Sequence, residues 1–406
     1  MISKSINLTL FGRFPTERAY GVHVVAVAKS YSKLGYKATI FYPSTDNEKT
    51  IFEDPQEYYN THEVQFQKVN HPDITKFYFY KILPKMMKGL LWSITAYQWS
   101  KKIKEYIKDS REIIWSTNPI LLYGSLQENN YIIFEMHGRA KKIQAIALKL
   151  LDRKASNRSL FISSSHYGRK DLLNRKFKTK IEYLPNGVDL NLFKPTPETK
   201  EEGVTPSNCL HIGYVGQLET YGVDKGMYLT IDALEKSINL NPHQQCGPTL
   251  LTVIGGPEES AERLKDYLDK KESQSLMTIN YLGQKKQSEL ASFITKFDIG
   301  IVPYPEDKHI SFYSSPMKIF EYAACGIPVV VSDIYTHRSL DNVGLGLEFY
   351  KADDVDSLAN LLSKYLHNQN REGKEGLASL GEMNISVRNG LSWEVRSKKT
   401  LDKLFS

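Results

Sequence analysis

The stretch from Ser311 to Asp333 limits the possible folds of this chain more than any other segment. Its sequence, SFYSSPMKIFEYAACGIPVVVSD, predicts a loop, a helix, a glycine turn and a strand. Residues 314–316, Ser-Ser-Pro, are typical of a helix start, because serine caps helices and proline fits the first turn. Gly326 predicts the helix end, and the valines at 329–331 predict a strand buried on both faces. This order is typical of one unit of a doubly wound α/β sheet, and an open helix start suits a phosphate.

The individual residues of this stretch resemble the nucleotide-sugar helix of the retaining GT-B glycosyltransferases of family 4. Members carry a Glu, seven residues, a second Glu, an alanine-rich helix, Gly-x-Pro-Val-Val and Ser/Thr-Asp. Glu321 stands at the second Glu, about two turns into the helix, where it suits the ribose diol. Tyr313 stands at the first Glu. The Ser-Pro-x-Lys-x-x-Glu-Tyr form resembles a variant of the same family, so this departure concerns the sugar contacts and not the nucleotide site.

The segment from Leu210 to Gly226 resembles a second element of the family, Gly-Arg-Leu followed by Lys-Gly. In that element an Arg and a Lys neutralise the pyrophosphate of the donor. Here Gln217 stands at the Arg position and brings no charge. The resemblance therefore makes Lys225 the main source of positive charge, helped by Lys318 or Arg13. The alternative is that Lys225 is an exposed lysine at a helix start.

The rest of the predicted donor site follows from the resemblance alone. In the family, the loop after the first strand lets backbone N–H groups approach the diphosphate, and Gly21 is the best match. The alternative is a glycine that only forms the turn. The backbone at Leu282 and Gly283 corresponds to the segment that holds the nucleobase. The complete predicted donor site is Gly21, Gln217, Lys225, Leu282, Gly283, Tyr313, Ser314, Ser315, Lys318 and Glu321.

The first half begins with the order expected of a Rossmann-like domain. Ile6–Phe11 predicts a strand, residues 13–21 a polar loop, His23–Leu34 a helix and Ala38–Tyr42 the next strand. The loop lacks the spaced triple glycine of dinucleotide-binding enzymes, so the sequence does not support an NAD site.

A strand that ends in Glu-x-His gives the predicted catalytic residue of the first half. Tyr131–Glu135 predicts this strand, and it runs into His137 at the strand end where α/β sites lie. The run resembles the acceptor-domain loop of the family, whose His lines the sugar site. The resemblance implies that His137 and Lys225 are catalytic, although a lone His is more often structural. We expect no metal or other cofactor, because Asp354-Val355-Asp356 is better explained as a helix N-cap than as a metal-binding D-x-D triplet.

Residues 185–195 predict the boundary between two domains. Their Pro-Asn-Gly-Val-Asp run and the following Phe-x-Pro resemble a specific mark of the family, and the polar residues 195–207 predict a linker. The length of 406 residues also suits two domains of about 200 residues. We therefore predict an α/β GT-B fold with two Rossmann-like domains facing across a cleft. Residues 1–190 form the acceptor domain, 191–385 the nucleotide-sugar domain, and 386–406 a helix that returns to the first domain.

The charge of the chain is uneven. Residues 1–190 have a net charge of +13 and residues 191–406 one of −6. The segment 76–108 is the most basic and aromatic, which suits an anionic membrane surface; the alternative is a core helix with solvated lysines. No nucleic-acid motif is present. The absence of a secretory leader or a long apolar run, with three unpaired cysteines, predicts a cytoplasmic location with peripheral membrane contact.

The resemblance implies a retaining, metal-independent glycosyltransferase. Such an enzyme moves a sugar from a nucleotide-diphosphate-sugar to a hydroxyl of a glycan or lipid-linked acceptor, in polysaccharide or glycolipid synthesis. Two alternatives stay open. A nucleotide-sugar 2-epimerase of the same fold would need acid and base residues of its own. A catalytically inactive, nucleotide-sugar-binding subunit would explain the departures at Tyr313 and Gln217.

Overall fold

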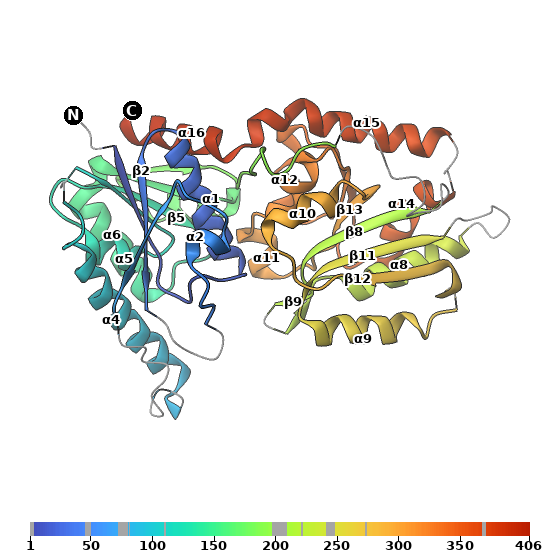
Figure 1. Ribbon diagram of the computed structural model, residues 1–406, viewed down its shortest axis with the longest axis horizontal. Coiled ribbons are helices and arrows are strands. Elements are labelled where there is room, and N and C mark those ends of the chain that lie inside the picture. Colours follow the sequence, from blue (N-terminus) through green and yellow to red (C-terminus); the bar gives the residue numbers. More distant parts are fainter. Residues whose placement is uncertain are drawn as a thin grey trace. The chain divides into compact units, whose positions relative to one another are not determined.

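The computed structural model contains two compact α/β units (Figure 1). The first unit is Met1–Pro185 together with Trp393–Ser406, and the second is Asn186–Ser392. The chain therefore changes unit after 185 and after 392, whereas the sequence predicted the changes after 190 and after 385. The structure describes residues 4–44, 50–71, 80, 82–108, 111–196, 209–220, 222–240, 248–272, 274–367 and 371–406.

The first unit is built on a parallel sheet with the strand order β3-β2-β1-β4-β5-β6-β7. Strands β4 and β6 are buried along their whole length, as expected where helices cover a parallel sheet. In the register, Ile6 of β1 pairs with Ala38 on one side and Ile113 on the other. The two strands predicted at the start of the chain are thus confirmed. The strands are β1 (Ser5–Thr9), β2 (Lys37–Pro43), β3 (Gln65–Val69), β4 (Ile113–Ser116), β5 (Tyr131–Met136), β6 (Ser159–Ser163) and β7 (Lys180–Tyr183).

Helix α1 begins earlier than the sequence suggested. The loop was predicted to run to Gly21, but the backbone N–H groups of Gly21 and Val22 already donate to Arg18 O, at 2.9 and 3.4 Å. The helix therefore starts at Ala19, and Gly21 lies in its first turn. The helices of the first unit are α1 (Ala19–Lys33), α2 (Pro55–Tyr58), α4 (Lys85–Ile103), α5 (Pro119–Ser125), α6 (Lys142–Ala155), α7 (His166–Leu173) and α16 (Trp393–Phe405).

The C-terminal helix α16 packs on α1 within the first unit. The hydroxyl oxygens of Ser30 and Ser397 lie 2.6 Å apart, and both residues are buried. One turn away, Lys33 Nζ lies 2.6 Å from Glu394 Oε1. These contacts bring the end of the chain back onto the first helix of the unit.

Helix α4 accounts for most of the described part of the basic, aromatic segment. Its second half is a core helix, with Trp99 and Ile103 fully buried. Its first half instead exposes apolar side chains, including Met86 at 84%. Residues 76–79 of the predicted segment lie outside the described residues. Among the helices that the structure describes, none combines the length and the apolar character needed to cross a membrane.

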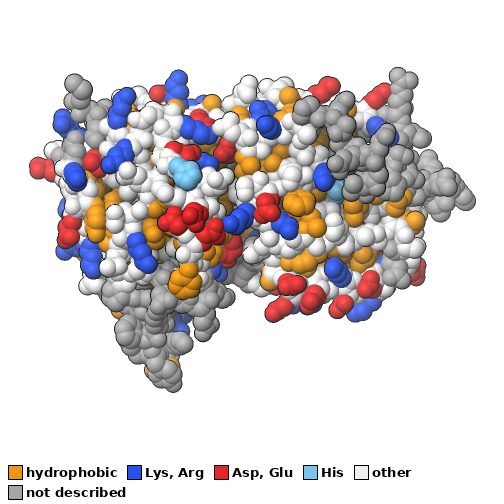
Figure 2. All heavy atoms as spheres, viewed as in Figure 1, with side chains coloured by type: hydrophobic (Ala, Val, Ile, Leu, Met, Phe, Trp, Pro, Cys, Tyr) orange, Lys and Arg blue, Asp and Glu red, His pale blue; other side chains and the backbone are white. Residues whose placement is uncertain are grey.

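The second unit contains a parallel sheet with the order β12-β11-β8-β13-β14-β15 and a small antiparallel hairpin, β9–β10. Acidic side chains gather along α9 of this unit, with Glu258 and Glu259 in its first turn (Figure 2). The strands are β8 (Leu210–Gln217), β9 (Glu219–Thr220), β10 (Val223–Asp224), β11 (Thr249–Gly256), β12 (Met277–Tyr281), β13 (Ile299–Val302), β14 (Val329–Ser332) and β15 (Leu347–Tyr350). The helices are α8 (Met227–Asn239), α9 (Glu258–Leu268), α10 (Gln287–Ile294), α11 (Lys308–Tyr313), α12 (Met317–Ala324), α13 (Tyr335–Arg338), α14 (Val355–His367) and α15 (Arg371–Val387).

The stretch predicted as loop, helix and strand contains α11, α12 and β14. Its first residues, through Tyr313, belong to the helix α11 and not to a loop, because Asp307 caps that helix through the backbone N–H groups of His309 and Ile310. Gly326 follows α12 with φ 78°, as the predicted helix end requires. The helix α12 is then fixed to the sheet by Tyr322, whose hydroxyl accepts from the backbone N–H of Val215 on β8 at 2.9 Å.

The side chain of Arg388 connects the first residues of the second unit with the C-terminal end of α12. Arg388 Nη2 donates to the carbonyl oxygens of Leu190 at 2.6 Å and Phe193 at 3.0 Å. Its Nε donates to the carbonyl of Ala324, the last residue of α12, at 3.0 Å. Most of the linker predicted at 195–207 lies outside the described residues.

The buried His337 of α13 predicts that acid destabilises the second unit. Its Nδ1 donates to Ser332 O at 2.8 Å, and burial lowers its pKa to about 4. In the unfolded chain the pKa of His is about 6.5, so the unfolded state binds more protons between these values and stability falls as the pH falls. We expect a loss of about 2 kcal/mol from pH 7 to pH 5. Native-state hydrogen exchange over residues 329–338 measures this loss.

The variant His337→Asn keeps an N–H donor but does not titrate, so its second unit should show a smaller loss between the two pH values. Tryptophan fluorescence provides the control: Trp92, Trp99, Trp115 and Trp393 all belong to the first unit, whose transition should be unaffected by the substitution. An equal pH dependence in the variant and the wild type would contradict the assignment.

Candidate functional site

The amino-terminal end of α12 has no side-chain cap among the described residues. Pro316 occupies the cap position. The sequence predicted serine capping, but Ser314 Oγ donates backward to Ile310 O at 2.5 Å, and Ser315 Oγ accepts from Asn186 N at 3.1 Å. The prediction of a serine cap is therefore wrong. The consequence favours an anion, because the start of α12 keeps backbone N–H groups that no side chain satisfies, together with the positive end of the helix dipole.

Asn186 holds the loop that leads into α12. Its backbone N–H and its side-chain Nδ2 both donate to Ser315, at 3.1 Å to Oγ and at 2.8 Å to the carbonyl oxygen. Asn186 is buried and belongs to the Pro-Asn-Gly-Val-Asp run. In the sequence, this run predicts the boundary between two domains. The structure adds a contact between residues 129 positions apart, which no local pattern reveals.

Glu321 is buried on α12 and has a partner at each carboxylate oxygen. Lys318 Nζ lies 2.5 Å from Oε2, and Gln287 Nε2 donates to Oε1 at 2.9 Å. The carboxylate is only 2% exposed. Each of its oxygens has further lone pairs, so it can also accept from hydroxyl groups. Gln287, the first residue of α10, is a site residue that the sequence did not single out.

Lys225 is buried, so the alternative of an exposed lysine at a helix start is wrong. It is 8% exposed, and its Nζ lies 5.1 Å from the ring centroid of Tyr304. Burial lowers the pKa of Lys225, and the nearby Asp307 and Asp224 oppose that shift. Between Gln217 and Lys225 the short strands β9 and β10 pair antiparallel, which the sequence did not predict.

Tyr304 interacts with Lys225 through its ring and with Glu321 through the charge of that carboxylate. Desolvation raises the pKa of Tyr304 to about 12, and the charge of Glu321 adds to this shift. The phenol therefore stays neutral at pH 7, and its ring lies beside the ammonium group of Lys225. A cation, a carboxylate and an uncapped helix start thus lie in one region of the second unit.

The backbone at Leu282 and Gly283 is largely engaged with the sheet. The N–H of Leu282 donates to Val253 O at 3.0 Å, and the carbonyl of Gly283 accepts from Gly255 N at 2.9 Å. Gly283 has φ 67°, which suits glycine at this turn after β12. Both residues are half-buried at the end of a strand of the sheet.

Gly21 and Arg13, which the sequence also named, belong to the first unit. A Cβ on Gly21 would lie 2.4 Å from Thr16 Cγ2 and 2.6 Å from Tyr59 Oη, so packing alone requires glycine there. Arg13 Nη2 forms an ion pair with Glu17 Oε1 at 2.5 Å. In the structure, these two residues therefore have evident structural roles.

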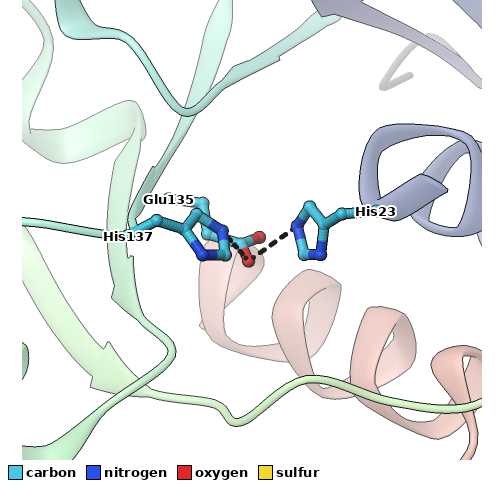
Figure 3. A group of neighbouring side chains, drawn as sticks. All are labelled: His23, Glu135 and His137. Atoms are coloured by element: carbon cyan, nitrogen blue, oxygen red, sulfur yellow. Dashed lines mark hydrogen bonds and ion pairs between the residues drawn. The ribbon is translucent and has the colours of Figure 1, made fainter. Parts of the chain in front are cut away.

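His137 lies just after β5 and belongs to a cluster around a buried carboxylate (Figure 3). Glu135 Oε1 lies 3.0 Å from His137 Nε2, 3.1 Å from His23 Nε2 and 2.7 Å from Arg396 Nη2. We call these four residues the Glu135 cluster. Glu135 is fully buried, whereas the His137 side chain is 34% exposed. His137 is thus the most exposed member of the cluster.

Three residues of the Glu135 cluster have the composition of a metal site. The ligand atoms of His23, Glu135 and His137 lie within 4.8 Å of one another, and two imidazoles with a carboxylate can bind a transition metal. The guanidinium of Arg396 already contacts the same carboxylate oxygen and opposes a second cation. The D-x-D triplet behaves as predicted, since Asp354 Oδ1 accepts from Ser357 N at 3.0 Å, as an N-cap does.

A comparison with protein families gives a match for the part of the chain that contains α12 and Lys225. Residues 210–368 match the family described as "Glycosyl transferases group 1". The matched residues all lie in the second unit. A comparison with curated protein sequences found no match.

Solved structures of glycosyltransferases share the fold of the whole chain. The glycosyltransferase from Rickettsia africae has a TM-score of 0.71 and 16% identity, covering 99% of this chain and 98% of that chain. Sucrose-phosphate synthase from Thermosynechococcus elongatus has a TM-score of 0.70 and 16% identity, covering 98% and 97%. HepE from Anabaena, in complex with UDP and glucose, has a TM-score of 0.65 and 15% identity, covering 100% of both chains. The predicted GT-B fold is therefore confirmed.

The candidate site departs at two positions from the family pattern that the sequence resembles. Tyr313 is the last residue of α11, and its ring stacks on His309 with the centroids 6.4 Å apart. Gln217 is the exposed last residue of β8. Since neither side chain is charged, Lys225 and the start of α12 are left as the main electrostatic features for binding an anion.

UDP, which the HepE structure contains, is the probe for this site. Glu321→Gln should weaken its binding about tenfold, roughly 1.4 kcal/mol, because a neutral amide accepts hydrogen bonds from hydroxyls less well than a carboxylate. Isothermal titration calorimetry of the full chain with UDP measures this change. Glu259→Gln is the matched control, since it removes the same charge from an exposed position on α9. Equal affinities of Glu321→Gln and the wild type would remove Glu321 from the site.

Proposed function

We propose that this glycosyltransferase moves a sugar from a nucleoside diphosphate sugar to a hydroxyl group of a glycan or lipid-linked acceptor. The observation that carries the proposal is the arrangement on the second unit. An uncapped helix start lies on α12, Glu321 lies deeper along the same helix, and the buried cation of Lys225 lies near it through Tyr304.

In this proposal, the diphosphate and the ribose of the donor each bind to a different part of this arrangement. The diphosphate accepts hydrogen bonds from the backbone N–H groups at the start of α12, in the loop that Asn186 holds. Lys225 supplies the positive charge, and its partial burial strengthens the attraction. The ribose hydroxyls donate to the carboxylate of Glu321.

The proposed reaction depends on stabilisation of the leaving diphosphate and involves no covalent intermediate with the enzyme. As the bond from the anomeric carbon to the diphosphate lengthens, negative charge grows on the phosphate and positive charge on the sugar. Fixed N–H dipoles and Lys225 stabilise the phosphate charge, so we propose that no metal ion is required. The acceptor hydroxyl attacks the face that the phosphate leaves, its proton passes to the leaving phosphate, and the anomeric configuration is retained.

The nucleobase that we propose is uracil. The HepE structure contains UDP and glucose, and a further similar structure from E. coli contains UDP-2-fluoro glucose. This support comes from other proteins of the same fold, and so the experiment must compare several bases.

The acceptor that we propose is lipid-linked. On α4, Met86, Met87 and Leu90 are 84%, 48% and 50% exposed, and Lys85 is an exposed basic neighbour. Apolar side chains beside a lysine suit the interface of an anionic bilayer. In this proposal the first unit binds the acceptor, with His137 facing its hydroxyl groups.

Hydrolysis of UDP-, GDP- and ADP-sugars by the full chain tests the proposed function. We expect one UDP-sugar to be hydrolysed without added metal and in the presence of EDTA, with release of a sugar of retained configuration, which NMR detects. Lys225→Met should lower this rate on the order of 10²-fold, because the developing charge loses its cation. Lys265→Met, on the exposed face of α9, is the control.

Other outcomes of this assay would overturn the proposal. Formation of a 2-epimer from the donor alone would identify an epimerase. Tight UDP binding without hydrolysis or transfer to any acceptor would identify an inactive binding subunit.

Co-sedimentation with vesicles tests the lipid-linked acceptor. The protein should bind vesicles that contain both phosphatidylglycerol and phosphatidylcholine. It should bind vesicles of phosphatidylcholine alone more weakly. The triple variant Met86→Gln, Met87→Gln, Leu90→Gln should lose this binding, whereas Met383→Gln, which is 43% exposed on α15, should keep it. Equal sedimentation of the triple variant and the wild type would exclude α4 as the contact.

A further inference from the structure

The Glu135 cluster joins the partly exposed His137 to the C-terminal helix. Glu135 and His137 are two positions apart at the end of β5, so their side chains lie on the same side of the chain. His23 comes from α1, and Arg396 comes from α16, 261 residues after Glu135. Figure 3 shows both imidazoles directed toward one oxygen of the carboxylate.

The charges of the cluster balance without a further cation. Burial raises the pKa of Glu135, but Arg396 and the neighbouring imidazoles outweigh burial and hold that pKa well below its usual range. Burial also lowers the pKa of His23 to about 4. At pH 7 the cluster therefore contains one carboxylate, one guanidinium and a neutral His23.

Arg396 is fixed by contacts other than the carboxylate. Its Nε donates to Pro185 O at 2.7 Å, and its Nη2 lies 3.3 Å from Leu184 O as an additional acceptor. The side chain is 6% exposed, with the guanidinium 5.4 Å from the ring centroid of Trp393. The guanidinium therefore has little freedom to leave Glu135.

We propose that Arg396 is a positioning residue that, through Glu135, keeps the proton of His137 on Nε2. A carboxylate only accepts hydrogen bonds, so the imidazole nitrogen that faces it must carry the proton. Nδ1 of His137 then keeps a lone pair. The inference rests on the proposed function, in which this lone pair accepts a hydrogen bond from a sugar hydroxyl.

The effect of removing Arg396 follows from the burial of Glu135. Without its cation, a fully buried carboxylate takes up a proton, because desolvation disfavours the charged form. A protonated Glu135 both donates and accepts, so it no longer dictates which nitrogen of His137 carries the proton. The tautomer of His137 is therefore the property that Arg396 controls.

Nuclear magnetic resonance of the full chain, labelled with ¹⁵N in histidine, tests this relationship. His137→Gln identifies the signals of His137 by their loss. In the wild type, at a pH high enough for the imidazole to be neutral, we expect the pattern of protonation at Nε2 only. In Arg396→Met we expect signals of the Nδ1-protonated form to appear, and in Arg396→Lys we expect the wild-type pattern. Lys399→Met removes the same charge from an exposed position on α16 and should change nothing.

The kinetics provide a second readout. Arg396→Met should lower kcat about tenfold or more, as loss of an orienting group does, and leave the KM for the donor within about twofold. A melting curve shows whether the variant is folded. If Arg396→Met does not fold, the same measurements are compared between Arg396→Lys, which keeps a positive charge, and Arg396→Gln, which does not.

Three results would overturn the inference. The first is a folded Arg396→Met with an unchanged His137 spectrum, which would make Arg396 a packing residue only. The second is a wild-type His137 protonated at Nδ1. The third is a change of the His137 signals on addition of EDTA, which would assign the cluster to a metal. If the wild type transfers no sugar, the proposed function fails, but the spectra still decide whether Arg396 controls the tautomer.

Discussion

The site depends on one constraint: the start of α12 must stay free of a side-chain cap and yet be held in place. Serine at a helix start normally caps it, but here both serines form other hydrogen bonds, Ser314 to the preceding helix and Ser315 to Asn186. The backbone N–H groups are thereby left for an anion. Tyr322 fixes the same helix to β8, and Arg388 fixes its end to the entering chain. The fold of the second unit thus holds a helix dipole rigidly without neutralising it.

The sequence predicted the fold well because its signals are local. Alternation of buried strands with glycine turns and helices identifies a doubly wound sheet, and the run around Glu321 resembles the nucleotide-sugar helix of a known family. Burial of Glu321 and Lys225 agrees with a site for a charged ligand. What the sequence could not give are contacts between distant residues. The pairs Asn186 with Ser315, Gln287 with Glu321 and Arg396 with Glu135 join residues whose spacing has no period, so no pattern reveals them.

The errors of the sequence analysis have local physical causes. The serine cap was wrong because hydrogen bonds to Ile310 and Asn186 compete with capping. The alternative of an exposed Lys225 was wrong because its ammonium group packs beside Tyr304, a residue distant in the sequence. In the first unit, the Glu-x-His run drew attention to His137. The buried partners of Glu135 explain why an acid stands there.

A crystal structure of the full chain with UDP tests whether the start of α12 binds the diphosphate. We expect density for the diphosphate within hydrogen-bonding distance of the backbone N–H groups at the start of α12, with the ribose hydroxyls on Glu321. A diphosphate bound elsewhere, or a Glu321 that keeps only Lys318 and Gln287 as partners while UDP is bound, would contradict this expectation.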